Sequence, residues 1–179
     1  MVDIAQRIYA LEGRIFELEE ELSELRTKLH GEQIDDAALT EWGGKAVRLS
    51  TLFGEQPYML LIHNMGFDCP YCTMWADGFN AVYDHVAAKA AFVLSSPDPI
   101  DRQRREAGAR GWRFSMVSTE GTTLAKDLGF ERDGKPLPGV SALIKGPDGA
   151  LKRNGIASFG PGDRFCPVWN LLDLLPKDT

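Results

Sequence analysis

The residues that decide the fold read Tyr58-Met59-Leu60-Leu61-Ile62, then Cys69-Pro70-Tyr71-Cys72, then the segment from Thr73 to Ala88. The first stretch is apolar, as in a buried strand, and the last is typical of a helix, so both cysteines lie where a strand passes into a helix. The start of a helix carries partial positive charge and unpaired N–H donors, which favour a thiolate, the reactive form of cysteine. Pro70 suits the first helical turn, where its missing N–H is not needed. This stretch therefore predicts a redox-active dithiol at a strand–helix junction.

Composition excludes several kinds of protein. The 179 residues fit one domain with an appendage, and a hydrophobic content of 44% allows a sizeable core. The formal net charge of −6 argues against nucleic acid as a partner, and no apolar run is long enough to span a membrane. The N-terminus is charged and amphipathic and has no apolar signal-peptide core. We therefore expect a cytoplasmic protein with neither nucleic acid nor a membrane among its partners.

The three cysteines are too few for a disulfide scaffold, and two of them share one Cys-x-x-Cys motif. In a reducing compartment such a motif indicates catalysis or metal binding. A structural zinc ion needs four ligands, and the chain has no second paired motif. The other candidate ligands are Cys166, His30, His63 and His85. We expect a redox site without a metal, with two structural thiols or half of a zinc site as the alternatives.

The first thirty residues carry a heptad repeat that predicts a separate long helix. Apolar residues are spaced alternately four and three apart, which is the period of a coiled-coil seam. The a positions are Ile8, Ile15, Leu22 and Leu29, and the d positions are Ile4, Leu11, Leu18 and Leu25. Isoleucine at a with leucine at d favours a parallel pair of helices, so we expect a homodimer through residues 4–29. A helix folded back on its own domain is the alternative.

The charges beside this seam agree with a parallel pair. A parallel register sets three opposite charges across the seam: Arg7 with Glu12, Arg14 with Glu19, and Glu21 with Arg26. An antiparallel register would set Glu12 against Glu19. We expect the helix to end at His30-Gly31, because glycine readily adopts the left-handed conformation of a helix C-cap.

The rest of the chain alternates strands and helices. Residues 31–57 are polar and contain glycine, so we expect a linker and an edge element there. The expected strands are 58–65, 91–95, 112–118, 140–145 and 150–156, and the expected helices are about 70–89, 99–110 with Asp98 as N-cap, 122–128 and 167–175, with a Gly- and Pro-rich loop at 131–139. The last two strands form a hairpin. Residues 58–179 are therefore expected to form an α/β domain with a mixed sheet and helices on both faces.

This layout resembles the thioredoxin superfamily, and the tetrapeptide at 69–72 is similar to that of glutaredoxins. Residues 58–156 also resemble peroxiredoxins in layout. Taken whole, the chain is similar to a bacterial family of thioredoxin-like proteins of unknown function, often labelled predicted dithiol-disulfide oxidoreductase. The matching blocks are the leading helix, Leu-Ser-Thr-Leu-Phe at 49–53, His63 with the dithiol and Trp75-Ala76-Asp77, and residues 169–173. The resemblance implies a thioredoxin-like three-layer sandwich with a long N-terminal helix.

Two departures from these families concern the site. Thioredoxins and glutaredoxins place a cis-proline before the hairpin strand, where this chain has Val140 or Ser141. Peroxiredoxins use a threonine three residues before the reactive cysteine and an arginine on a later strand. Aligning Cys72 with that cysteine puts Cys69 at the threonine and Val140 near the arginine. The first departure argues against substrate docking like that of thioredoxin, and the second argues against a peroxidase of that mechanism.

Each sulfur has an expected role. Cys69, at the exposed tip of the helix, should attack, and Cys72, one turn further in, should resolve the mixed disulfide. Four neighbours are candidate modulators of this reaction: His63, Asp68, Trp75 and Asp77. His63 could tune Cys69, shuttle a proton or simply be hydrogen-bonded, and Asp68 could raise the pKa of the neighbouring thiol or cap the helix. Trp75 could wall the site or fill the core. Asp77 could serve as acid/base for the inner thiol or be a solvated or capping carboxylate. Cys166, before a second helix, is an extra thiol or a structural one.

We therefore predict an enzyme for thiol–disulfide exchange. It needs no metal or organic cofactor, only a thiol or disulfide partner, either a protein or a small thiol. A thiol peroxidase using the same cysteines is the second interpretation. The third is a non-catalytic dimeric scaffold in which the coiled coil supplies the function.

Overall fold

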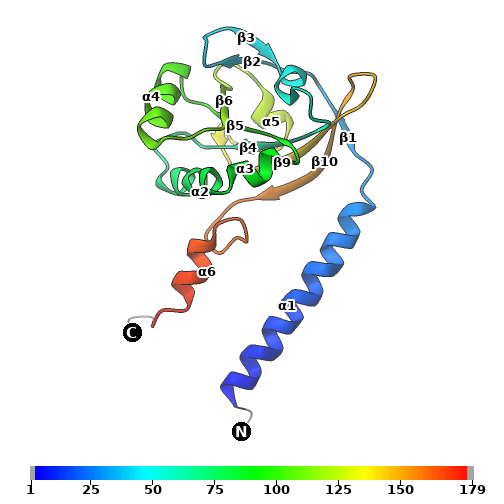
Figure 1. The fold of residues 1–179 in the computed structure, drawn as a ribbon, viewed down its shortest axis with the longest axis vertical. Helices are drawn as coiled ribbons and strands as arrows, with labels where there is room; N and C mark the ends of the chain where they lie inside the picture. The colour runs from blue at the N-terminus through cyan, green and yellow to red at the C-terminus, as the bar shows by residue number, and fades with distance from the viewer. Residues whose placement is uncertain (1–2, 177–179) are drawn as a thin grey trace.

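The computed structural model describes residues 3–176, whose body is an eight-stranded mixed sheet (Figure 1). The strands follow the order β1-β10-β9-β4-β5-β6-β2-β3. Their bounds are β1 Glu32–Ile34, β2 Ala38–Glu41, β3 Ala46–Arg48, β4 Tyr58–His63, β5 Ala91–Ser96, β6 Ser115–Ser118, β9 Gly139–Lys145 and β10 Leu151–Ser158. The central strands β4, β5 and β6 are parallel, and the flanking strands pair antiparallel. The predicted mixed α/β sheet is confirmed.

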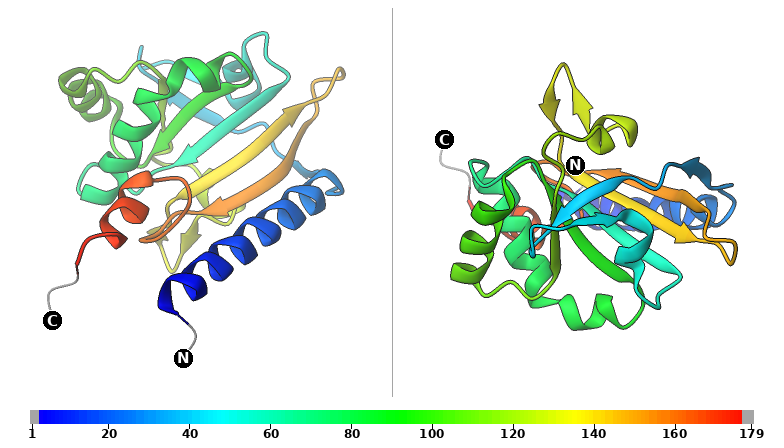
Figure 2. Two further views of the ribbon diagram at one scale, coloured as in Figure 1. Left: turned by 60° about the horizontal axis from the view of Figure 1, so that its bottom comes forward. Right: turned by 90° about the horizontal axis from the view of Figure 1, so that it is seen from above.

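Helices cover both faces of this sheet (Figure 2). The helices are α2 Pro70–Ala81, α3 Tyr83–Ala87, α4 Ile100–Arg110 and α6 Pro167–Asp173 on one face, and the 3-10 turn η1 Leu49–Phe53 with α5 Leu124–Asp127 on the other. Successive residues of β5 alternate between the two faces: Val93 packs with the η1 side, and Phe92 and Leu94 pack with the α2 side. The three-layer arrangement is the one the sequence predicted.

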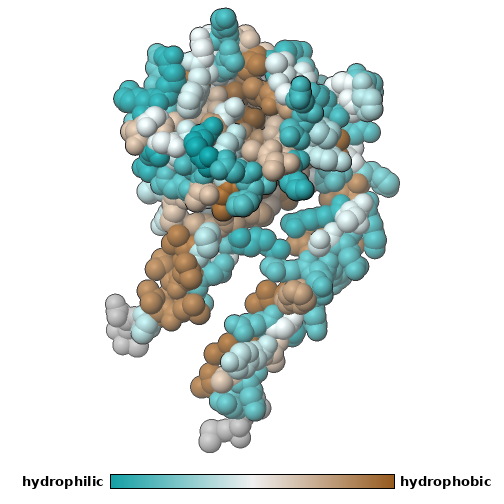
Figure 3. Space-filling view, in the orientation of Figure 1, coloured by the Kyte–Doolittle hydropathy of each residue, from teal (hydrophilic) through white to brown (hydrophobic). Residues whose placement is uncertain are grey.

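The long helix α1, Ile4–Thr27, extends away from the body (Figure 1). No side chain of this helix is buried within the part of the chain that the structure describes. Arg164, before α6, contacts Glu19 of α1 at 3.4 Å. Apolar side chains lie along α1 and cover much of α6 (Figure 3). Within residues 3–176, none of the helices has the length and apolar character that a bilayer crossing requires.

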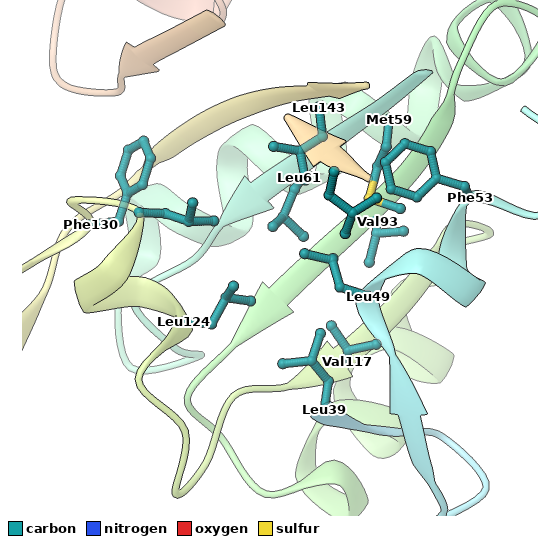
Figure 4. Close-up of a cluster of buried hydrophobic side chains, with 12 residues drawn as sticks. Leu39, Leu49, Phe53, Met59, Leu61, Val93, Val117, Leu124, Phe130 and Leu143 are labelled. Carbon is teal, nitrogen blue, oxygen red and sulfur yellow. The ribbon is translucent and has the colours of Figure 1, made fainter. Parts of the chain in front are cut away.

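The core on the η1 side gathers side chains from strands that are distant in sequence (Figure 4). Leu61 of β4 and Val93 of β5 meet Leu49 of η1 there, each at most 1% exposed. Burying a side chain of this kind contributes roughly 1.5–3 kcal/mol. This packing holds β4, the strand that leads to the dithiol, against its neighbours.

Several boundaries differ from the prediction. The expected helix over 70–89 breaks at Val82, whose N–H turns back to the carbonyls of Phe79 and Asn80. The Asn80 carbonyl also accepts a hydrogen bond from the Arg113 guanidinium. The chain continues after this break as the short helix α3. Residues 31–57 do more than link, because β1 forms one edge of the sheet and β2 and β3 the other. These strands have three or four residues each, too few to show a clear alternation in the sequence.

Two further differences are local. Helix α1 ends at Thr27 with Lys28 as its C-cap, three residues before the expected end at His30. The expected loop at 131–139 contains a small hairpin, β7 Glu131–Arg132 with β8 Lys135–Pro136. Neither changes the sheet that positions the dithiol.

Candidate active site

Cys69 is the N-cap residue of α2, with Pro70 in the first turn. Its Sγ accepts the backbone N–H of Cys72 at 3.3 Å, in the place where a serine or aspartate oxygen usually caps a helix. The side chain is partly exposed. A sulfur at this point lies in the positive field of the helix terminus.

Cys72 lies one turn further along α2 and is only 3% exposed. Burial raises the pKa of the Cys72 thiol to about 12, and the neighbouring Cys69 contributes to this rise through a hydrogen bond and its charge. The backbone N–H of Met65 donates to the Cys72 Sγ at 3.4 Å, which opposes the rise. Cys72 is therefore a neutral thiol near pH 7, whereas Cys69 is the sulfur that faces solvent.

The space beside Cys72 is too small for a substrate. A void of about 10 Å³ lies between Cys72, Trp75, His63 and Phe159. One water needs about 10–15 Å³. Larger molecules can therefore reach the dithiol only at Cys69.

The loop before the dithiol is held by Asp98. This buried carboxylate accepts the N–H of Phe67 at 2.9 Å and the hydroxyl of Ser96 at 2.9 Å. Gly66 has φ +102, and a side chain there would approach Asp98 to 3.0 Å, so the loop requires glycine. Asp98 was expected to cap α4, but Pro99 holds that position and Asp98 fixes the dithiol loop instead.

Asp68, next to Cys69, was expected to cap α2, but the N-cap residue is Cys69. The Asp68 carboxylate forms two hydrogen bonds to the Arg102 guanidinium, at 2.6 and 3.1 Å, and these lower the pKa of the Asp68 carboxyl. Arg102 also binds Asp98 at 2.8 Å. Arg102 was not predicted as part of the site, because its partner Asp68 lies 34 residues away in the sequence.

His63 ends β4 and is 3% exposed. Its Nε2 lies 3.0 Å from the Ser141 hydroxyl, and its ring stacks on Phe130 with centroids 3.8 Å apart. Burial, with a smaller effect from the charge of Arg153, lowers the pKa of His63 to about 3. The imidazole is therefore neutral at physiological pH and is held as a packed, hydrogen-bonded group near the inner thiol.

The other two candidate modulators lie on different faces of α2. Trp75 is buried beside Phe159, with centroids 5.5 Å apart, and packs near Tyr71 and Trp169. Its side chain forms part of the wall around Cys72.

Asp77 points away from the dithiol, towards the end of α4, where it accepts the indole N–H of Trp112 at 2.7 Å and pairs with Arg110 at 2.9 Å. These contacts fix α2 against the end of α4, so Asp77 belongs to the helix packing.

Cys166 is the N-cap residue of α6, 2% exposed, and packs in the same cluster as Cys72. Among residues 3–176, no three or more His, Cys, Asp or Glu side chains are arranged to hold a metal ion.

Comparison with known proteins identifies a family to which the chain belongs. A sequence model of the AhpC/TSA family matches residues 30–153. No curated protein matches the chain. Peroxidoxin BcpB from Mycobacterium tuberculosis is a similar solved structure, with 25% identity, coverage of 73% of this chain and 85% of that chain, and a TM-score of 0.60.

Two structures from Xanthomonas campestris share the fold at lower identity. A cysteine-to-serine mutant of peroxiredoxin Q has 18% identity, coverage of 81% of this chain and 97% of that chain, and a TM-score of 0.60. Bacterioferritin comigratory protein, studied for alkyl peroxide reduction, has 16% identity, coverage of 80% and 94%, and a TM-score of 0.58. The family match begins after α1, so the long helix is an addition to the matched region.

Proposed function

The chain belongs to the AhpC/TSA family, and we propose that it is a dithiol redox enzyme whose main reaction is thiol–disulfide exchange. The observation that carries this proposal is the difference between the two sulfurs. Cys69 is partly exposed at a helix N-terminus, and Cys72 is buried with its pKa raised to about 12. The outer sulfur is built to attack and the inner one to resolve.

The reaction proceeds in two exchanges. The Cys69 thiolate attacks one sulfur of a substrate disulfide, and the other substrate sulfur leaves as a thiolate that takes up a proton. Cys72 then loses its proton and attacks the Cys69 sulfur, which releases the second substrate thiol. The substrate disulfide is reduced to two thiols and the enzyme retains the Cys69–Cys72 disulfide, which an external thiol returns to the dithiol.

The mixed disulfide itself activates Cys72. Two of the causes that raise the pKa of Cys72 are its hydrogen bond to Cys69 and the negative charge of the Cys69 thiolate. Both disappear once Cys69 is bonded to substrate, whereas the N–H of Met65 still favours the Cys72 thiolate. The inner sulfur thus becomes easier to ionise at the step that needs it. A reducing compartment such as the cytoplasm would supply the thiol that completes the cycle.

Peroxide reduction is the second candidate, and the family match favours it. In this reaction Cys69 attacks a peroxide oxygen, an alcohol or water leaves, and Cys72 condenses with the resulting sulfenic acid to release water. The cysteine that aligns with the peroxiredoxin nucleophile is Cys72, which is buried and neutral. Arg102, near the site, is bound by two carboxylates. These observations rank disulfide exchange first.

Comparing two oxidants tests the proposal. We expect the reduced protein to lose thiols faster with an accessible protein disulfide, such as insulin, than with equimolar hydrogen peroxide. Cys69→Ser should not react with either. Cys72→Ser should accumulate as a mixed disulfide with the substrate, seen by mass spectrometry, and Cys166→Ser should turn over like the parent protein.

Two outcomes would redirect the assignment. Faster thiol loss with peroxide would make the enzyme a thiol peroxidase. Full activity in Cys69→Ser would contradict both redox functions and leave the scaffold interpretation.

A further inference from the structure

Helix α1 lacks the packing that a helix of its length normally receives. Its 24 residues bury no side chain against the described part of the chain. Six of the seven seam residues within α1 are at least 49% exposed, and the seventh, Leu22, is half-buried. The exposed six are Ile4, Ile8, Leu11, Ile15, Leu18 and Leu25. In water, isolated helices are marginal and most helical stability comes from covering the apolar face.

We propose that a second copy of this chain covers that face, as a parallel and in-register two-stranded coiled coil over α1, Ile4–Thr27. The apolar stripe has the two-in-seven period of a coiled-coil seam, which a partner helix of the same sequence matches along its whole length. The exposed seam side chains leave room for such a partner, and α1 extends away from the body (Figure 1). The occupant is thus another α1.

Charge complementarity fixes the direction of the pair. In the parallel register, residues at g lie near residues at e of the next heptad of the partner. Three of these neighbours carry opposite charges, and each occurs twice by symmetry: Arg7 with Glu12, Arg14 with Glu19, and Glu21 with Arg26. Every such contact in the described helix is attractive.

The antiparallel register is disfavoured by the same residues. It would set Glu12 against Glu19 and Arg7 against Lys28, each twice, with Arg14 against Glu21 as the attractive contact. Because these like charges would repel each other in an antiparallel pair, they favour the parallel orientation. The bodies of a parallel pair lie at the same end of the coil, because only Lys28 to Gly31 separate α1 from β1.

The test uses the full chain and measures its mass by sedimentation equilibrium. The parent protein should have twice the 19.8 kDa of one chain at micromolar concentration. Arg14→Glu and Glu19→Arg should each weaken self-association at least tenfold, since each sets two like-charge pairs across the seam. An equimolar mixture of the two variants should dimerise like the parent, because both contacts become attractive in the mixed pair.

Two controls separate this interface from other effects. Glu20→Arg makes the same charge change at the outer f position and should leave the mass unchanged. Arg164→Gln removes the contact to Glu19 within the chain and should also leave it unchanged. A monomeric parent protein, a mass of three or more chains, or a dimer insensitive to Arg14→Glu would overturn the proposal, and so would failure of the mixture to restore pairing.

Discussion

At the scale of single residues, the two sulfurs differ mainly because Cys72 is buried and Cys69 is partly exposed. The N–H of Met65 donates to Cys72 and opposes the rise of its pKa, and Arg102 comes from α4 to pair with Asp68 beside Cys69. A carboxylate next to a thiol disfavours its thiolate, so the pairing of Asp68 with Arg102 removes an obstacle to attack.

Removing this pairing should slow the outer thiol. In Arg102→Gln the exposed carboxylate of Asp68 is left beside Cys69, so alkylation of Cys69 by iodoacetamide should be slower than in the parent protein. Asp68→Asn should not slow it, and adding Asp68→Asn to Arg102→Gln should restore the rate. A double variant as slow as Arg102→Gln would show that Arg102 acts through the loop contact to Asp98 and not through charge.

The buried His63 makes stability depend on pH. Its pKa is about 3 in the folded protein and 6.5 for a free side chain, so the unfolded chain binds a proton between these values and the folded one does not. The contribution of neutral His63 to stability is complete above pH 6.5 and is lost as pH falls towards 3. The loss is about 1.4 kcal/mol per pH unit inside this window.

Urea unfolding at pH 7 and pH 5 measures this effect. The parent protein should lose about 2 kcal/mol more than His63→Gln over this interval, because the variant cannot titrate there. Equal losses in the two proteins would contradict a neutral, buried imidazole.

At the scale of elements, the sequence predicted those parts whose signal is local. The run at 58–62, the dithiol and the following helix were predicted together, since strand, junction and helix are contiguous. The strands β1, β2 and β3 were missed because they are short and polar and are held by pairing with remote strands. For the same reason, the roles of Asp98 and Arg102 could not be read from the sequence.

The pairing of β9 and β10 beside His63 depends on one glycine. A Cβ on Gly139 would overlap the ring of Phe130, which is buried and stacked on His63, and the backbone carbonyl oxygen of Ala157 in β10. Gly139→Ala should therefore lower the free energy of unfolding by roughly 1–3 kcal/mol. Gly155→Ala, whose Cβ meets Ala142 at an ordinary 3.4 Å, is the matched control and should change it by less than about 0.5 kcal/mol. Equal effects of the two changes in chemical denaturation would contradict this account.

At the scale of the whole molecule, the sheet carries the dithiol, and α1 extends away from it (Figure 1). All eight strands of the main sheet lie between Glu32 and Ser158. The family match covers residues 30–153. That residues 1–30 fold and act independently of the rest of the chain is a prediction.

Deleting residues 1–30 tests this division. The shortened protein should have the mass of a single copy in light scattering, because the seam is gone. Its free energy of unfolding at high dilution and its rate of disulfide reduction should match those of the parent chain, since α1 buries no side chain. A large loss of stability or activity would show that the helix supports its own body.

The aromatic wall around Cys72 has an optical consequence. Trp75 borders the same void as the inner sulfur, and its ring centroid lies 6.4 Å from that of Trp169. A disulfide quenches indole emission at short range, so each closing and opening of the Cys69–Cys72 bond should dim and brighten the intrinsic fluorescence. In the proposed cycle the oxidised and reduced forms would therefore differ in emission, and turnover could be followed in real time without any added dye.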